Sequence, residues 1–94
     1  MRIRNFVHKG LRRLYEDDDP RGLPVGAVEK LRKMLAFLDA VASGEEVRDV
    51  PIWKAHKLTG NRRGTWSLHV SRNWRLTFRI AGDEVADVDF EDYH

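Results

Sequence analysis

Cysteine is absent from the 94-residue sequence, which excludes disulfide bridges, a cysteine nucleophile and most structural zinc sites. The three tryptophans and the other apolar side chains must hold the fold by packing alone, an arrangement compatible with a reducing cytoplasm. A chain of this length is expected to form one domain, residues 1–94, around one modest core.

Long hydrophobic runs are also missing, because charged residues interrupt each apolar stretch within a few positions. No segment has the length of a membrane-spanning helix, and the N-terminal MRIRNFVHKG lacks the apolar core of a secretory signal peptide. The sequence holds no glycine-rich phosphate loop, no HExxH and no GxSxG motif, and its four histidines are scattered. We therefore expect a cytoplasmic protein with no membrane contact, no metal and no other cofactor.

Charge is unevenly distributed, although the formal net charge is only +2. Residues 52–79 hold seven lysines and arginines and no acidic residue, whereas residues 80–94 hold six acidic residues and no lysine or arginine. Positive charge without counter-charge is typical of a surface that binds a polyanion. The same pattern also fits a solvated face whose arginines pair with the acidic tail, and composition leaves both interpretations open.

The N-terminal half predicts one strand and two helices. Charged and apolar residues alternate over residues 2–6, and apolar residues recur at helical spacing over residues 8–16, where the acidic run 17–20 ends the pattern. A longer amphipathic pattern covers residues 25–43, with Ser43-Gly44 as its C-terminal stop.

The C-terminal half changes to a period of two. Residues 66–70, 74–80 and 85–90 alternate in polarity and are joined by short turn-like links, which indicates an antiparallel meander, and residues 54–58 are a candidate for another strand. We therefore expect an α+β fold in which the two helices pack on one face of a twisted, mainly antiparallel sheet. The other face of the sheet, which is polar, should be exposed to solvent.

That polar face is where chemistry is expected. It should carry the basic residues of the second strand of the meander beside the acidic residues of the third, with Val85 among them. Metal-independent RNA cleavage needs acid–base groups for the 2′-OH and the 5′-oxygen, and cations for the phosphorane. Candidates for these roles are His56, Arg75, Asp92, Tyr93 and His94, with Lys54 and Lys57 flanking the first. Taken alone, the last three residues also fit a frayed chain end, and the histidine an ordinary surface side chain.

Four segments of the sequence resemble the HigB-type "plasmid maintenance killer" toxins of the RelE/ParE superfamily. They are residues 8–11 (HKGL), 64–67 (GTWS), 73–78 (NWRLTF) and 91–94 (EDYH). They occur in the family's order and at its spacing and span nearly the whole chain. The resemblance implies a RelE-like fold that agrees with the one predicted from periodicity.

The resemblance also implies an activity. Such toxins are ribosome-dependent mRNA interferases that cut codons in the decoding site of the small ribosomal subunit. They are silenced by a HigA-type helix-turn-helix antitoxin, and they contact operator DNA only through this antitoxin. We therefore expect a monomer when the toxin is free and a hetero-oligomer with the antitoxin.

Residue by residue, His56 matches the family's active-site histidine, and Asp92, Tyr93 and His94 match its catalytic C-terminus. Arg75 matches an arginine near the scissile phosphate. The RNA-binding candidates are the matched Asn73, near the third base of the codon, and the basic residues Lys54, Lys57, Arg72 and Arg79.

One departure from the family pattern lies beside the active-site histidine. The family usually reads His-Pro-Leu-Lys-Gly there, whereas this sequence reads His56-Lys57-Leu58-Thr59-Gly60. Lys57 supplies a positive charge, but from the opposite strand face, which puts the role of the missing lysine in doubt.

Two other functions fit the same scaffold. One is a ParE-like inhibitor of DNA gyrase that cuts no RNA, although such a binder has no need of His56 or the terminal Asp-Tyr-His. The other is a general nucleic-acid-binding domain, which would show steeply salt-dependent binding without cleavage.

Overall fold

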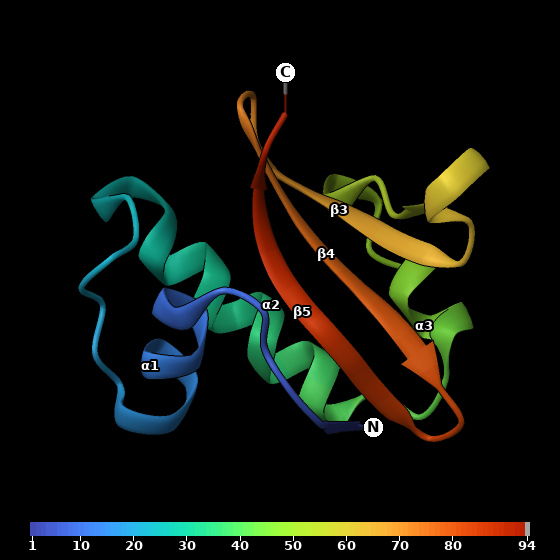
Figure 1. Cartoon of the computed structure of the whole chain (residues 1–94), viewed down its shortest axis with the longest axis horizontal. Coiled ribbons are helices and arrows are strands. Elements are labelled where there is room, and N and C mark those ends of the chain that lie inside the picture. The colour runs from blue at the N-terminus through green and yellow to red at the C-terminus, as the bar shows by residue number, and fades with distance from the viewer. Residues whose placement is uncertain (94) are drawn as a thin grey trace.

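The structure is a computed structural model that describes residues 1–93 (Figure 1). Its helices are α1 (Lys9–Asp17), α2 (Val28–Ala40) and α3 (Gly44–Arg48), and short 3-10 turns cover residues 25–27, 51–53 and 60–62. Its strands are β1 (Arg2–Ile3), β2 (His56–Lys57), β3 (Thr65–Ser71), β4 (Trp74–Ala81) and β5 (Glu84–Asp92).

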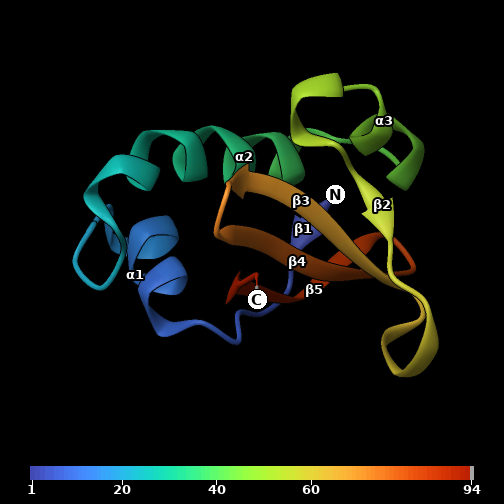
Figure 2. The same cartoon turned by 90° about the horizontal axis from the view of Figure 1, so that it is seen from above.

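The strands form one sheet in the order β1-β5-β4-β3-β2, in which β3, β4 and β5 are the predicted antiparallel meander. β2 pairs antiparallel with β3 at one edge, and β1 pairs parallel with β5 at the other. α2 runs across one face of the sheet, and α1 lies beside α2 (Figure 2). The prediction of an α+β fold with a mainly antiparallel sheet and two N-terminal helices is confirmed.

His8 is the N-cap of α1, and its Nδ1 accepts a hydrogen bond from the backbone N–H of Leu11 at 3.2 Å. This bond satisfies one of the amide groups that a helix start leaves without an intrahelical partner. The helix buries Leu11 and Leu14, and it ends where Asp18 adopts a left-handed φ of 53° inside the acidic run. The predicted stop at residues 17–20 is confirmed.

The second helix is shorter than its hydrophobic pattern suggests. It ends at Ala40, because Val41 is extended while its side chain still packs in the core. Four side chains on its inner face are at most 2% exposed, and the burial of each contributes about 1.5–3 kcal/mol; they are Leu31, Met34, Leu35 and Leu38.

Ser43-Gly44, predicted as the end of a helix, instead begins α3. The Glu46 carboxylate accepts hydrogen bonds from the backbone N–H groups of Ala42 and Ser43, at 2.5 and 3.4 Å. The carboxylate of a third helical residue that reaches back to the N-cap is half of a capping box. Because α3 has only five residues, this local capping, and not hydrophobic periodicity, identifies it.

The predicted faces of β5 are wrong at Val85. This side chain is fully buried and its residue pairs with Ile80, because a bulge at Asp87 shifts the alternation by one residue before Val88. Asp87 has a φ of 54° and is held by Asn5, whose Nδ2 donates to the Asp87 carboxylate at 2.8 Å and whose Oδ1 accepts from the Asp87 amide at 3.0 Å. A bulge of this kind inserts one unpaired residue and bends the strand.

The polar face of the sheet is not uniformly wet, contrary to prediction. Three polar side chains on it, Thr65, Ser67 and Thr77, are buried. Buried hydroxyl groups require hydrogen-bond partners, so other side chains must cover this part of the polar face.

Candidate active site

A pocket of about 200 Å³ lies over the polar face. The strand register explains its composition, because His56 is opposite Ser67, Ser67 is opposite Thr77, and Arg75 is opposite Glu91. The side chains that line it come from β2, β3, β4, β5 and the loops beside them: His56, Leu58, Arg62, Ser67, Arg75, Thr77, Glu91, Asp92 and Tyr93.

The structure therefore brings together four predicted catalytic residues, His56, Arg75, Asp92 and Tyr93. The fifth, His94, lies outside the described residues. Residues 56 and 92 are far apart in the sequence, and the β2–β3–β4–β5 pairing is what places them around one pocket.

The imidazole of His56 is oriented by the backbone just before it. Its Nδ1 lies 3.1 Å from the carbonyl oxygen of Lys54. A carbonyl only accepts, so Nδ1 carries the hydrogen and the neutral ring keeps its lone pair on Nε2. Lys54 has a left-handed φ of 48°, a conformation that is rare for side chains other than asparagine or aspartate and that sets the direction of this carbonyl.

Arg75 and Tyr93 form a stacked pair at the mouth of the pocket. The guanidinium carbon lies 3.9 Å from the centre of the Tyr93 ring, and Nη1 donates to the carbonyls of Ser71 and Trp74 at 2.7 and 3.0 Å. The Tyr93 amide donates to the Asn73 carbonyl at 2.6 Å, while its side chain is 61% exposed. The ring is therefore held on its arginine side and open to solvent.

Glu91, Arg62 and Thr77 form a hydrogen-bonded group that the sequence analysis did not assign to the site. Arg62 donates from Nη1 and Nη2 to the two carboxylate oxygens of Glu91, at 2.8 and 2.5 Å, and the Thr77 hydroxyl also donates to Oε2. The hydrogen bonds from Arg62 lower the pKa of Glu91 against the opposing effect of burial, and the same bonds raise the pKa of Arg62.

Asp92 reaches the pocket from the last position of β5. Its Cα partner across the sheet is Trp74, whereas the partner of Glu91 is Arg75. Because successive side chains of a strand leave on opposite faces, Glu91 is the carboxylate on the polar face, and Asp92 borders the pocket from the strand end.

The predicted RNA-binding residues are spread more widely than the pocket. Arg72 and Asn73 form the turn between β3 and β4, beside the Tyr93 backbone. Lys57 does not belong to the pocket, because its Nζ lies over the Trp66 ring, 5.2 Å from the centre, on the opposite face of β2 from His56. Arg79 is four residues along β4 from Arg75, roughly 13 Å away at the rise of a strand, and does not line the pocket.

His69 lies opposite Arg75 on the polar face, outside the pocket. Burial lowers the pKa of its imidazole, and the positive charges of Arg75, Lys30 and Lys54 lower it further. The same surroundings favour the neutral ring near neutral pH.

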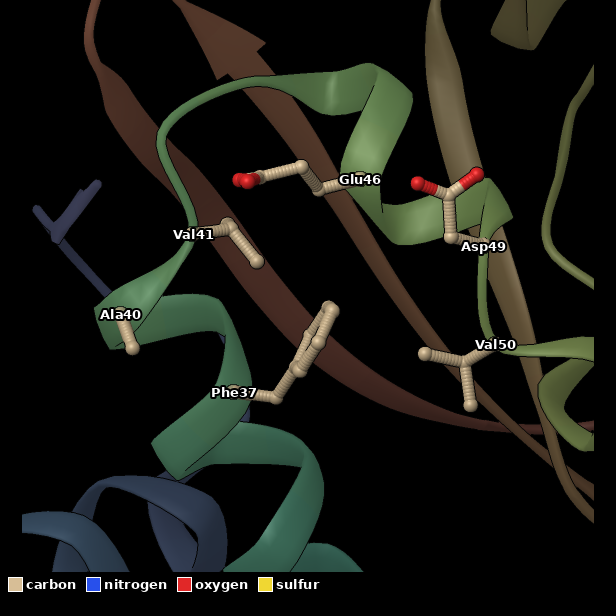
Figure 3. Close-up of a pocket in the computed structure, with 6 residues that line it drawn as sticks. All are labelled: Phe37, Ala40, Val41, Glu46, Asp49 and Val50. Carbon is tan, nitrogen blue, oxygen red and sulfur yellow. The ribbon is translucent and has the colours of Figure 1, made fainter.

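A larger pocket, of about 400 Å³, is lined by residues of α2, of α3 and of the segments that follow these two helices. Figure 3 shows Phe37, Val41 and Val50 directed toward one another there, with the carboxylates of Glu46 and Asp49 at the edge. Phe37 packs edge-on against Trp53, with ring centres 5.0 Å apart. This cavity contains none of the predicted catalytic residues.

Within residues 1–93, no three histidine, aspartate or glutamate side chains gather in a group able to hold a metal ion. None of the helices in the same range is both long and apolar enough to cross a membrane.

The fold belongs to the class of RelE-like toxins. The chain is similar to the YoeB/ParE toxin from Agrobacterium tumefaciens, with a TM-score of 0.59 over 100% of both chains at 14% identity. It is also similar to YafQ from E. coli, with a TM-score of 0.55 over 98% of this chain and 93% of that one at 13% identity. These likenesses concern the fold alone.

Sequence comparison defines the family. Residues 4–94 match the family described as the RelE-like toxin of type II toxin-antitoxin system HigB. The chain is 39% identical to "Endoribonuclease HigB" of Proteus vulgaris over 93 residues, which cover 98% of this chain and 99% of that protein. It is 33% identical to "Toxin HigB-1" of Vibrio cholerae over 90 residues, or 95% of this chain and 94% of that protein. The chain belongs to the HigB-like toxin family, and a type II system implies an antitoxin partner.

Proposed function

We propose that this toxin is an endoribonuclease that cuts messenger RNA in the decoding site of the small ribosomal subunit and so inhibits translation. The observation that carries the proposal is the pocket that gathers His56, Arg75, Asp92 and Tyr93. Its relative in Proteus vulgaris is named an endoribonuclease, which supports the same activity here.

The reaction is an attack of the ribose 2′-OH on the adjacent phosphate, which leaves a 2′,3′-cyclic phosphate and a 5′-OH. Asp92 or His94 serves at the 2′-OH, and His56 takes the complementary acid–base role. The Nδ1–H bond to the Lys54 carbonyl is available in both protonation states of His56, so Nε2 either accepts or donates the proton with the ring in one orientation.

Arg75 stabilises the negative charge of the phosphorane. Its Nη1 is occupied by two backbone carbonyls, which orients the guanidinium and leaves Nη2 and Nε for phosphate oxygens. The open face of Tyr93 is a platform for a base, and the side-chain amide of the neighbouring Asn73 pairs with an adenine edge of the codon.

The partners that fit this activity are a HigA-type helix-turn-helix antitoxin, the small ribosomal subunit and mRNA. The free toxin is a cytoplasmic monomer, the antitoxin complex is a hetero-oligomer, and operator DNA is contacted through the antitoxin only. Lys54, Arg72 and Arg79 contribute to RNA binding outside the pocket through their positive charge.

The test is a primer-extension map of cuts in mRNA incubated with purified ribosomes and the toxin. Wild type is expected to cut within codons, and His56→Ala to lose about 10²–10⁴-fold in rate. His69→Gln changes a histidine on the same face outside the pocket and is the matched control, expected to cut like wild type. Intact mRNA together with inhibited gyrase supercoiling would favour the ParE-like alternative. Salt-steep binding to free RNA or DNA without either effect would indicate a general nucleic-acid binder.

A second test uses growth arrest in cells. A variant that lacks residues 92–94 is expected to permit growth while it still binds the antitoxin and keeps a cooperative thermal transition. Growth arrest by the truncated toxin at the wild-type level would show that the assigned residues are wrong.

A further inference from the structure

The side chain of Arg62 reaches the pocket from a loop with little secondary structure of its own. Arg62 ends the 3-10 turn 60–62 between β2 and β3, whereas Glu91 lies near the end of β5, 29 positions later. Two Arg–carboxylate hydrogen bonds, at 2.8 and 2.5 Å, join them in a fork-to-fork pair. The pair therefore ties the loop at the pocket's edge to the sheet.

The Arg62–Glu91 pair is anchored to the sheet by Thr77. This threonine is 3% exposed in the middle strand β4, and its hydroxyl donates to Glu91 Oε2. The Arg62 and Glu91 side chains are 49% and 27% exposed, whereas the Arg21–Asp19 and Arg48–Glu45 pairs each include a side chain that is at least 80% exposed. Anchoring to a buried hydroxyl distinguishes the pair in the pocket from an ordinary surface salt bridge.

A carboxylate in a pocket for RNA phosphate requires an explanation, because it opposes binding of the anion. Glu91 is poorly suited to act as a base, since each oxygen already accepts a hydrogen bond and its pKa lies below the usual range. With Arg62, Arg75, Glu91 and Asp92 charged, the formal charges of the described pocket cancel. The Glu91 carboxylate must therefore contribute through the side chain that it binds, Arg62.

We propose that Arg62 is a second phosphate-binding residue of the pocket and that Glu91, fixed by Thr77, is the positioning residue that orients it. A guanidinium has five N–H groups, and the pair with Glu91 uses two of them. The remaining three are available to phosphate oxygens in the pocket that Arg75 and Tyr93 also line. Two arginine side chains that are already oriented before the substrate binds stabilise the charge of the phosphorane without having to rearrange during the reaction. This inference rests on the proposed ribonuclease function.

The proposal predicts opposite effects of two substitutions on binding. Binding is measured with ribosomes carrying an mRNA whose scissile nucleotide is 2′-deoxy, which removes the attacking hydroxyl. Arg62→Ala is expected to weaken this binding and to reduce its salt slope by about 0.7, the change for one lost phosphate contact on a single strand. Glu91→Ala removes a negative charge and is expected to leave binding equal or tighter.

Cleavage of the normal mRNA under saturating, single-turnover conditions gives the second measurement. Both variants are expected to lose roughly 10²-fold, Arg62→Ala because a cation is missing and Glu91→Ala because the cation is misplaced. Arg62→Lys is expected to recover binding more than rate, since an ammonium keeps the charge without the fork. Arg63→Ala, an exposed neighbour outside the pocket, is the control and is expected to cut within about twofold of wild type.

The outcomes separate the two proposals. If wild type leaves ribosome-bound mRNA uncut, the ribonuclease function fails. If wild type cuts and Arg62→Ala cuts as well as Arg63→Ala, the role of Arg62 is refuted alone. If Glu91→Ala weakens binding and lowers the rate together with its melting temperature, Glu91 is structural only. Should Glu91→Ala fail to fold, Glu91→Gln takes its place, because glutamine keeps the shape of the side chain and removes the charge. The proposal then predicts binding that is equal or tighter and cleavage that is slower than in wild type.

Discussion

Gly10→Ala is predicted to destabilise the toxin although alanine is the better helix former. Gly10 lies in the first turn of α1, where a Cβ would come 2.8 Å from His8 Cε1, 3.1 Å from His8 Nδ1 and 3.1 Å from the Gly22 carbonyl oxygen. The imidazole cannot move freely, because it caps the Leu11 amide and packs edge-on against Phe90 with ring centres 5.8 Å apart.

The magnitude follows from three contributions. Loss of the cap costs about 1 kcal/mol, and overpacking in a close contact costs about 1–3 kcal/mol. Replacing a helical glycine by alanine returns about 0.5–1 kcal/mol. The net loss is about 1–3.5 kcal/mol. Each kcal/mol corresponds to a fall in melting temperature of roughly 4–8 °C for a domain of this size.

The assay is a double-mutant cycle followed by thermal unfolding. In His8→Ala the ring is gone, so Gly10→Ala meets only the Gly22 carbonyl, and its cost should be at least about 1 kcal/mol smaller than in wild type. Gly26→Ala, where nothing lies within 4 Å of the added Cβ, is the control. Additive effects of the His8 and Gly10 substitutions would refute the reasoning. The folded Gly10→Ala variant should cut mRNA normally, because α1 is not part of the pocket.

Three further predictions concern the core, the bulge and pH. Leu38→Ala, at a fully buried position, should cost about 2–5 kcal/mol in urea unfolding, and a loss below about 1 kcal/mol would contradict the packing described. Asp87→Gly should be tolerated, whereas Asp87→Val should lower the melting temperature through about 1–3 kcal/mol of strain at a φ of 54°; equal melting temperatures would argue against the bulge. Burial and neighbouring cations lower the pKa of His69 below 6.5, so the unfolded chain binds a proton on this imidazole more readily than the folded chain does. The free energy of unfolding should therefore fall as the pH drops through about 6.5. His69→Gln should flatten that part of the plot of stability against pH, and an unchanged slope would count against this cause.

The elements that the sequence predicts well are those with sustained periodicity. The inner face of α2 and the strands β3 and β4 carry a hydrophobic pattern long enough to identify type and face together, whereas for β5 the pattern identifies the strand but not the face of Val85. The β5 bulge escapes prediction because it depends on Asn5, which reaches Asp87 only after β1 has paired with β5. A contact 82 positions apart leaves no local trace in the sequence.

The pocket shows the same division. His56, Arg75 and Tyr93 are recognisable one at a time, as residue types suited to RNA cleavage that also match a known family. Arg62 and Glu91 are ordinary members of the basic run and the acidic tail until the strand register places them together. Lys57 illustrates the converse, since its charge suits RNA but strand alternation sends it to the Trp66 ring on the other face.

Of the two interpretations of the charge pattern, pairing of the arginines with the acidic tail is seen at one position, and binding of a polyanion stays a prediction. Glu91 of the acidic strand β5 pairs with Arg62 of the basic run, which reaches it from the loop between β2 and β3. At the hairpin end the arrangement differs, because Arg75 is held by backbone carbonyls and an aromatic ring, and Arg72 stands exposed in the turn. The acidic tail thus compensates Arg62, whereas Arg72 and Arg75 lie at and beside the turn between β3 and β4. Under the proposed function, the phosphate of the RNA is expected at this end of the sheet, because Arg75 and Tyr93 line the same pocket as His56.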